Sequence, residues 1–348
     1  MKHIGKKGFC VFTIIFLLTA MTSCDTKKKT KSSTEEIKIG VAIYRGDDAF
    51  ISSLYKYMEQ DAKKKEESTG RRITLVLADG KNSQMNQTDQ LEDFINKDYD
   101  VICANLVDRT VASTIAVKAK EAGIPLVFFN REPVREDLNI WEQTYYVGSD
   151  AKEAGELAGE IVTSAYEATK EQMDKNKDGK IQYVLLEGNP GHQDALVRTE
   201  YAISTITNAG IEMERLANGT ANWMRDYAYG TMNEWIREFG DGIELVISNN
   251  DDMAIGAITS LNENNDKMSK TFVVGTDGTE EGIEKVIKGE MLGTVKNDAK
   301  GQAEAIVDIA IASSIGKKVE SIRPNMENRI ERIPQYMVVE ANVEDFVE

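Results

Sequence analysis

The feature that most constrains the fold is an alternation of short β-branched runs with longer amphipathic stretches, which starts at Glu36. The run at 37–43 is followed by a helical pattern to about Glu67 and by a second apolar run at 73–78. The alternation continues and predicts further strands at 101–104, 125–129, 183–186, 245–248 and 272–275. Strands that alternate with helices form parallel sheets, because each helix returns the chain across the sheet before the next strand starts. We therefore expect an α/β protein built on parallel sheets.

The length of the alternating region indicates two lobes. About 310 residues follow position 35, which is more than one hydrophobic core usually organises. No segment rich in Pro, Gly and Ser divides this region into sequential halves. The lobes are therefore expected to be interwoven through several short crossings. Near the end, short strand patterns at 329–332 and 336–339 interrupt the parallel rhythm, as expected for a further crossing.

The N-terminal segment has the pattern of an exported lipoprotein. Lysines precede an apolar run at 9–20 that is too short to span a bilayer, which predicts a signal peptide at 1–23. The motif Met-Thr-Ser-Cys that ends at Cys24 resembles the lipobox of bacterial lipoproteins. Residues 24–35 then carry a lipidated cysteine and a polar tether with no apolar side chain after Cys24. We expect an exported protein anchored to the outer face of the cell membrane, or on its periplasmic side; the alternative is an ordinary signal peptide with a chance cysteine.

The net charge argues against a nucleic-acid-binding protein, and the cysteine content argues against a disulfide-stabilised one. Removing residues 1–23 takes away three lysines and moves the formal net charge from −16 to −19, which argues against a nucleic-acid partner. Of the three cysteines, Cys10 leaves with the signal peptide and Cys24 is expected to carry lipid. Cys103 then remains as a single thiol inside an apolar strand. No disulfide framework is expected.

Asp or Asn follows most of the predicted strands. Ligands of open parallel sheets bind beyond the carboxyl ends of the strands, so these positions report on the function. Any one of them is explained by a turn or a helix cap, but the whole set fits a polyhydroxylated ligand, because each sugar hydroxyl both donates and accepts hydrogen bonds. Aromatic rings cover the apolar faces of a pyranose. The strand-end residues are Asp47, Asp48, Asn105, Asn130, Asn249, Asn250, Asp277 and Asn297.

Catalytic motifs have no comparable support. His192 is the only histidine that remains after residues 1–23 are removed, and no Gly-x-Ser-x-Gly motif accompanies it. The glycine-containing stretch at 188–191 lacks the spacings of dinucleotide-binding and phosphate-binding loops. We therefore expect a binding protein and not an enzyme.

A short acidic loop resembles the calcium loop of EF-hands. Oxygen-bearing side chains alternate up to a glycine, with a backbone carbonyl and a further side-chain oxygen after it. The ligands expected on this pattern are Asp174, Asn176, Asp178, the carbonyl of Lys180, and Gln182. The twelfth position is Leu185, so a carboxylate has to come from elsewhere. The alternative is a turn without metal.

Several stretches match one family in the same order. They are 39–44, 47–50, 105–108, 127–130, 132–133, 145–148, 174–182, 190–192, 249–251 and 297–298. On these stretches the chain resembles the galactose/glucose-binding proteins of bacterial ABC sugar importers over residues 36–348.

The resemblance implies a type I periplasmic-binding-protein fold, in which two lobes are joined by three hinge crossings. The crossings are expected near Ile124-Pro125, Lys296-Asn297 and Arg332-Ile333. The N-terminal lobe then comprises 36–124 plus 297–332, and the C-terminal lobe comprises 125–296 plus 333–348 and carries the calcium loop.

The resemblance also implies a ligand site. Hydroxyl-binding residues are expected from both lobes, with Phe50 and Trp223 on the two faces of the sugar ring, and Glu244 is expected to supply the missing calcium ligand. The polar set is Asp48, Asn105, His192, Asp194, Arg198, Asn250, Asp277 and Asn297.

The function that the resemblance implies is high-affinity capture of D-galactose, D-glucose or both, and delivery to the membrane permease of an ABC importer. Signalling to a chemoreceptor or a sensor kinase is compatible with that function. The protein is expected to be a monomer. The alternatives are a receptor for another monosaccharide, such as ribose or xylose, and a sugar sensor for a membrane kinase.

Overall fold

The computed structural model describes residue 1, residues 36–265 and residues 270–347. The predicted signal peptide, Cys24 and the tether lie outside the described residues, so they stay predictions. In the part of the chain that the structure describes, no helix has both the length and the apolar character that crossing a bilayer requires.

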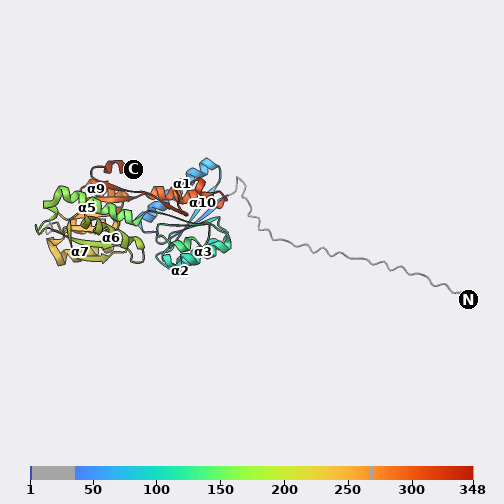
Figure 1. The fold of residues 1–348 in the computed structure, drawn as a ribbon, viewed down its shortest axis with the longest axis horizontal. Helices are drawn as coiled ribbons and strands as arrows, with labels where there is room; N and C mark the ends of the chain where they lie inside the picture. The colour runs from blue at the N-terminus through green and yellow to red at the C-terminus, as the bar shows by residue number, and fades with distance from the viewer. Residues whose placement is uncertain (2–35, 266–269, 348) are drawn as a thin grey trace. The chain divides into compact units, whose positions relative to one another are not determined.

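The first lobe is built on a six-stranded parallel sheet in the order β11-β5-β4-β3-β1-β2. Helices α1 (Ala49–Thr69) and α10 (Ala299–Ser314) cover one face, and α2 (Gln84–Asn96) and α3 (Ala112–Ala122) cover the other (Figure 1). The short helices η1 (Arg109–Val111), α4 (Arg135–Leu138) and η3 (Val319–Ser321) complete this lobe. Its strands are β1 (Ile37–Ile43), β2 (Ile73–Asp79), β3 (Val101–Ala104), β4 (Leu126–Phe129), β5 (Thr144–Gly148) and β11 (Ile330–Arg332).

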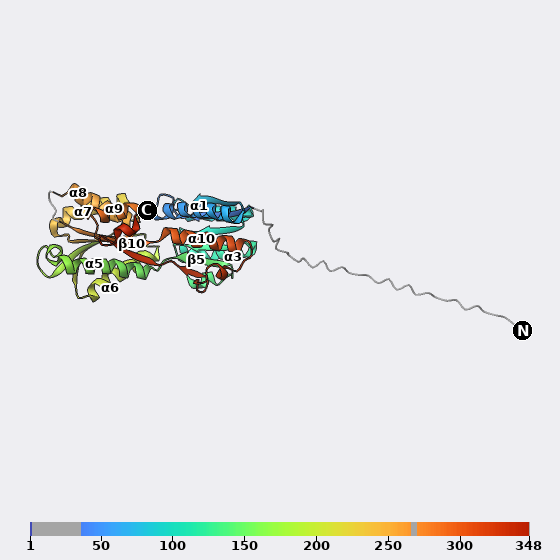
Figure 2. The ribbon, with the colours of Figure 1, turned by 90° about the horizontal axis from the view of Figure 1, so that it is seen from above.

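The second lobe repeats this plan with the order β12-β10-β9-β8-β6-β7, in which β12 alone runs antiparallel to its neighbour. Figure 2 shows α7 (Arg225–Phe239), α8 (Asp251–Glu263) and α9 (Glu280–Ile287) on one side of the sheet, and α5 (Ala151–Met173) and α6 (Gln193–Asn208) on the other. The short helices η2 (Gly240–Gly242) and η4 (Val343–Phe346) complete this lobe. The strands are β6 (Lys180–Glu187), β7 (Glu212–Thr220), β8 (Leu245–Ser248), β9 (Phe272–Asp277), β10 (Gly293–Asn297) and β12 (Gln335–Val339).

The periodicity of the sequence explains why each sheet buries both faces. Along β1, Ile39 and Val41 pack toward α1 and α10, whereas Ala42 packs toward α2 and α3. Burying one Ile or Val side chain stabilises the fold by about 1.5–3 kcal/mol. The predicted α/β fold with two parallel-sheet lobes is confirmed.

The first crossing was predicted in the wrong place. β4 and β5 pair with the first sheet, so residues 125–148 belong to the first lobe and the chain leaves it only after Gly148. The Gly-Ile-Pro sequence at 123–125 ends α3, because Gly123 adopts a left-handed φ of 68°. Pro125 then enters the sheet, and its carbonyl accepts a hydrogen bond from the Ile102 amide at 3.0 Å.

The chain crosses twice more near its end. It passes from β10 of the second sheet to α10, which packs on the first lobe, directly after Asn297. It returns from β11 to β12 between Arg332 and Gln335. The lobes are thus interwoven through three short segments.

Candidate functional site

A cavity lies where the carboxyl ends of strands from both sheets meet. The space between its walls, open solvent included, is about 320 Å³. Its lining comes from both lobes. The lining residues are Tyr44, Asp48, Phe50, Ile51, Asn130, Arg131, His192, Arg198, Trp223, Asn250 and Asp277.

Three of the lining residues are the N-caps of helices. Asp48 precedes α1, His192 precedes α6 and Asn250 precedes α8. Asp48 accepts from the Ile51 amide at 2.9 Å and Asn250 accepts from the Met253 amide at 3.0 Å, so the capping interpretation of these residues is correct. Each cap nevertheless faces the cavity as well. Besides its capping hydrogen bond, Asp48 accepts one from the Tyr44 hydroxyl, so both of its oxygens are held in place beside the cavity.

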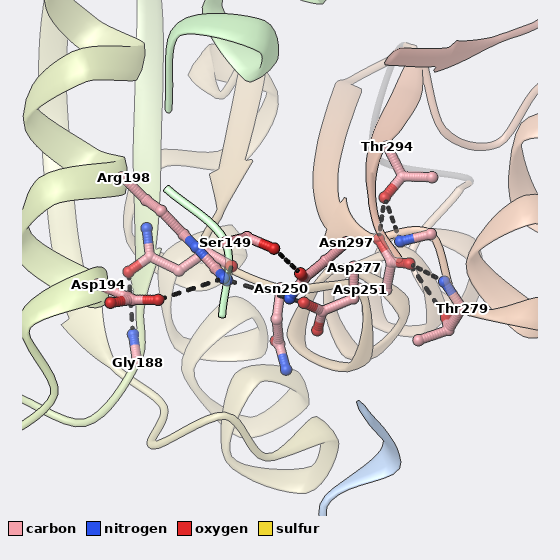
Figure 3. Close-up of polar contacts among 12 residues, drawn as sticks. Ser149, Gly188, Asp194, Arg198, Asn250, Asp251, Asp277, Thr279, Thr294 and Asn297 are labelled. Carbon is pink, nitrogen blue, oxygen red and sulfur yellow. Dashed lines mark hydrogen bonds and ion pairs between the residues drawn. The ribbon is translucent and has the colours of Figure 1, made fainter. Parts of the chain in front are cut away.

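An ion-pair cluster forms the second-lobe side of the cavity (Figure 3). Arg198 lies 3.8 Å from an Asp277 oxygen and 3.7 Å from an Asp194 oxygen, and it donates to the Asn249 carbonyl at 2.8 Å. Burial raises the pKa of Asp277 well above its usual range, and it also raises the pKa of Asp194. Burial, with arginines nearby, lowers the pKa of His192 well below its ordinary value. His192 is therefore neutral at pH 7 and offers one donor and one acceptor.

Several buried polar atoms on the cavity wall have no hydrogen-bond partner among the described residues. They are His192 Nε2, Arg198 Nε, Trp223 Nε1, and Nε and Nη2 of Arg131. A buried donor without a partner costs about 1–3 kcal/mol. Their convergence on one cavity indicates a ligand that supplies oxygen acceptors.

The aromatic residues Phe50 and Trp223 contribute from opposite lobes, and both are buried. Trp223 has a φ of 65°, in the left-handed region. Its ring lies against the backbone of Gly188, where a Cβ would be only 2.1 Å from the nearest ring atom. The imidazole of His192 meets the Trp223 indole edge-on, with ring centroids 5.3 Å apart.

Backbone strain at Asp277 is held by a neighbouring carboxylate. Asp277 has a φ of 121°. Asp251 accepts from the Thr279 amide at 2.8 Å and from the Thr294 hydroxyl at 2.6 Å, which ties the loop after β9 to β10 (Figure 3). Burial raises the pKa of Asp251 to about 6.

Most predicted ligand residues line the cavity, but three do not. Asn105 is fully buried, accepts from the Tyr44 amide at 3.2 Å and donates to Asn130 at 3.0 Å, so it orients two lining residues. Asp194 contacts His192 and Arg198 from behind, and Asn297 lies at the second crossing. Those that line the cavity are Asp48, Phe50, His192, Arg198, Trp223, Asn250 and Asp277.

Four lining residues were absent from the predicted ligand set. Asn130 was identified as a strand-end residue but was not included in the ligand set, and Tyr44 and Arg131 come one and two positions after strands, where the same rule could have found them. Arg131 stacks on the Tyr44 ring at 3.9 Å and donates to the Val107 carbonyl at 2.6 Å. The fourth, Ile51, has no such signal.

The predicted calcium loop is folded around its own oxygens. Asp174 accepts from the Gly179 amide at 3.0 Å, and Gly179 has the left-handed φ of 86° that the sharp turn needs. Glu244, directly before β8, reaches the loop and accepts from the amides of Lys175 at 2.6 Å and Gln182 at 2.9 Å. Carboxylate, amide and carbonyl oxygens are the donors that Ca²⁺ takes.

The acidic side chains alone do not form a metal site. Among the residues that the structure describes, no three Asp, Glu, His or Cys side chains converge closely enough to hold a metal. The amides of Asn176 and Gln182 instead bond to each other at 3.1 Å and both donate to Asp178. The donor chemistry therefore fits calcium, and the ion stays a prediction.

Comparisons with known proteins agree with this geometry. The family model described as periplasmic binding protein domain matches residues 39–318. The D-galactose/methyl-galactoside binding periplasmic protein of Haemophilus influenzae is 37% identical over 344 residues, covering 98% of this chain and 99% of the relative. A putative rhizopine-binding protein of Rhizobium meliloti is 32% identical, covering 91% and 94%. The crystal structure of an ABC transporter solute binding protein from Bacillus halodurans with bound myo-inositol has a TM-score of 0.75 at 27% identity, covering 91% and 99%.

Proposed function

The chain belongs to the periplasmic binding protein family, and from that premise we propose that it captures one hexose, D-galactose or D-glucose, and delivers it to the permease of an ABC importer. The relative from Haemophilus influenzae, which is named for galactose binding, spans almost the whole of both chains. The cavity is the site of capture.

The observation that carries this proposal is the set of unpaired buried donors on the cavity wall. Arg198, Trp223 and Arg131 each present an N–H group without a partner among the described residues. A pyranose offers ring and hydroxyl oxygens to such groups, while Asp48 and Asp277 accept from its hydroxyls. Phe50 and Trp223 provide apolar surface for the C–H faces of the ring.

Contacts between the lobes favour capture by closure. From the first lobe, Arg109 donates to the side chain of Gln193, and Arg45 donates to the Asn222 carbonyl at 3.4 Å. A ligand that contacts both walls shifts the equilibrium toward this arrangement by its differential affinity for the closed form. The closed form is then the state that the permease recognises.

The proposal includes a structural Ca²⁺ in the loop at 174–182 and a lipid anchor at Cys24. The loop's oxygens and the buried Glu244 carboxylate support the ion. Two acyl chains on Cys24 would supply the two membrane signals that stable anchoring requires.

Isothermal titration calorimetry of the delipidated, calcium-replete protein tests the ligand. Galactose or glucose should bind with heat release, and their deoxy analogues should bind more weakly, because each missing hydroxyl leaves a buried partner unpaired at about 1–3 kcal/mol. The panel includes ribose, xylose and myo-inositol. Absence of binding by either hexose, or tighter binding of ribose, xylose or myo-inositol, would contradict the proposal.

A further inference from the structure

Three polar side chains, two of them buried, meet at the hinge. Ser149 lies in the first crossing, Asn297 ends β10, and Gln302 belongs to the first turns of α10. The Ser149 hydroxyl donates to Asn297 Oδ1 at 2.7 Å, and Gln302 Nε2 donates to the same oxygen at 2.6 Å and to Ser149 Oγ at 3.0 Å. Figure 3 shows Ser149 directed at Asn297. Asn297 and Gln302 are almost fully buried.

The hydrogen bonds among Ser149, Asn297 and Gln302, called the hinge triad below, do not by themselves fix the orientation of the two amides. Rotating both carboxamides by 180° would keep the hydrogen bonds of the hinge triad but exchange every donor and acceptor. Asp277 breaks this symmetry. A hydrogen bond from the Asn297 amide lowers the pKa of the Asp277 carboxyl, which otherwise rises on burial. The rotated form would turn Asn297 Oδ1 toward that carboxylate, placing one acceptor against another.

We propose that Ser149 and Gln302 are positioning residues that hold the Asn297 carboxamide with its Nδ2–H groups facing Asp277, a lining residue of the cavity, so that Asn297 acts as a donor at the edge of the ligand site. The proposal rests on the function proposed above and deepens it. Oδ1 already accepts two hydrogen bonds, and Nδ2 is therefore the atom left to donate toward Asp277 at the edge of the cavity.

The hinge triad also crosses the boundary between the lobes. Asn297 ends a strand of the second sheet, whereas α10 with Gln302 packs on the first lobe. The third crossing is linked to this cluster as well, because Arg332 donates to the Ser149 carbonyl at 3.1 Å. The hydrogen bonds that orient a ligand donor are thus the same ones that link the crossings.

Several groups face the Asp277 carboxyl and set its charge. Arg198 from α6 lowers the pKa of Asp277, while Asp251 from α8 and Asp48 before α1 raise it, and Asn297 lowers it by its hydrogen bond. Reversing the Asn297 amide removes one stabilising donor and adds a repelling acceptor. The pKa of Asp277 should then rise further.

The test is Gln302→Glu, which replaces the Nε2 donor by an acceptor and forces Asn297 to turn its amide around. In the ligand-free protein, carboxyl ¹³C NMR should show a higher pKa for Asp277 than in the wild type. Calorimetry at pH 7 should show about tenfold weaker hexose binding, the loss expected when one buried hydrogen bond is removed. Gln302→Met, which removes the donor without adding charge, is the second variant, and it should lower affinity a few-fold.

The matched control is Gln335→Glu. Gln335 is equally buried and lies opposite Asn297 in the neighbouring strand, but its side chain has no hydrogen-bond partner among the described residues. It should lose thermal stability while hexose affinity and the pKa of Asp277 stay as in the wild type. An unchanged pKa and affinity in both Gln302 variants, or an equal change in Gln335→Glu, would overturn the inference. Failure of the wild type to bind a hexose would instead refute the proposed function, and the NMR comparison would still decide this one.

Discussion

Gly188→Ala tests most directly whether the Trp223 ring forms one wall of the ligand site. A Cβ at this position would lie 2.1 Å from the Trp223 ring, whereas ordinary contact begins at 3.4 Å, so the indole has to move by about 1.3 Å. Gly188 does not have a left-handed φ, so alanine adds no backbone strain there. The ring can move only toward the cavity, because its other side packs in the core of the second lobe.

The size of the effect follows from this geometry. Overpacking of this kind costs about 1–3 kcal/mol. In the free protein the cavity accepts the displaced ring, but a bound sugar needs the same space. Most of the cost should therefore appear on binding, as a loss of hexose affinity of about 5-fold to 150-fold, with little change in melting temperature.

Calorimetry and tryptophan fluorescence measure the affinity, and differential scanning calorimetry measures the stability. Gly242→Ala is the control, because a Cβ there meets no atom within 4 Å and the residue lacks a left-handed φ. It should leave both quantities unchanged. If Gly188→Ala binds the hexose as tightly as the wild type, Trp223 does not rest on Gly188 in the bound state and the reasoning is wrong.

Three further predictions concern the metal, pH and the anchor. Chelation of calcium should lower the melting temperature, because an ion bound only to the folded state at a hundredfold excess over its Kd stabilises that state by about 3 kcal/mol. Glu244→Ala should abolish this response to the chelator. Unchanged melting of the wild type on chelation would exclude the ion. The raised pKa of Asp251, about 6 against an ordinary 3.8, means that the folded state holds this proton more tightly. The free energy of unfolding should therefore fall by about 2 kcal/mol from this group as the pH rises from 4 to 6. Urea titrations should show a smaller fall in Asp251→Asn, and an equal fall would disprove the assignment. Cys24→Ser should release the exported protein into a soluble fraction, and continued membrane association would count against lipidation.

The fold was predictable because its signals are local. Most strands of the two sheets are short apolar runs rich in β-branched residues, and the helices between them keep one apolar face, whereas β7 has no such run and was not predicted. The misplaced first crossing shows the limit. The break at 123–125 looks the same whether it ends a helix or a lobe, and only the pairing of β4 with β3 distinguishes the two.

The rule that polar residues after strands mark the site located some lining residues of the cavity and misplaced others, for a related reason. The position of a residue after a strand predicts that it reaches the cavity edge, and Asp48, Asn250 and Asp277 do so. It does not predict which side chain is already engaged by neighbours, as Asn105 is by Tyr44 and Asn130.

The sequence by itself determined the elements, their parallel order and the polar character of the strand ends, since these depend on residues close together in the chain. Tertiary structure alone decided where the chain crosses and which polar atoms remain unpaired. It also brought Glu244 to a loop more than 60 positions earlier and joined Ser149 to Asn297 across the hinge. Such contacts depend on the packing of two sheets, and the spacing of residues along the chain carries no record of it.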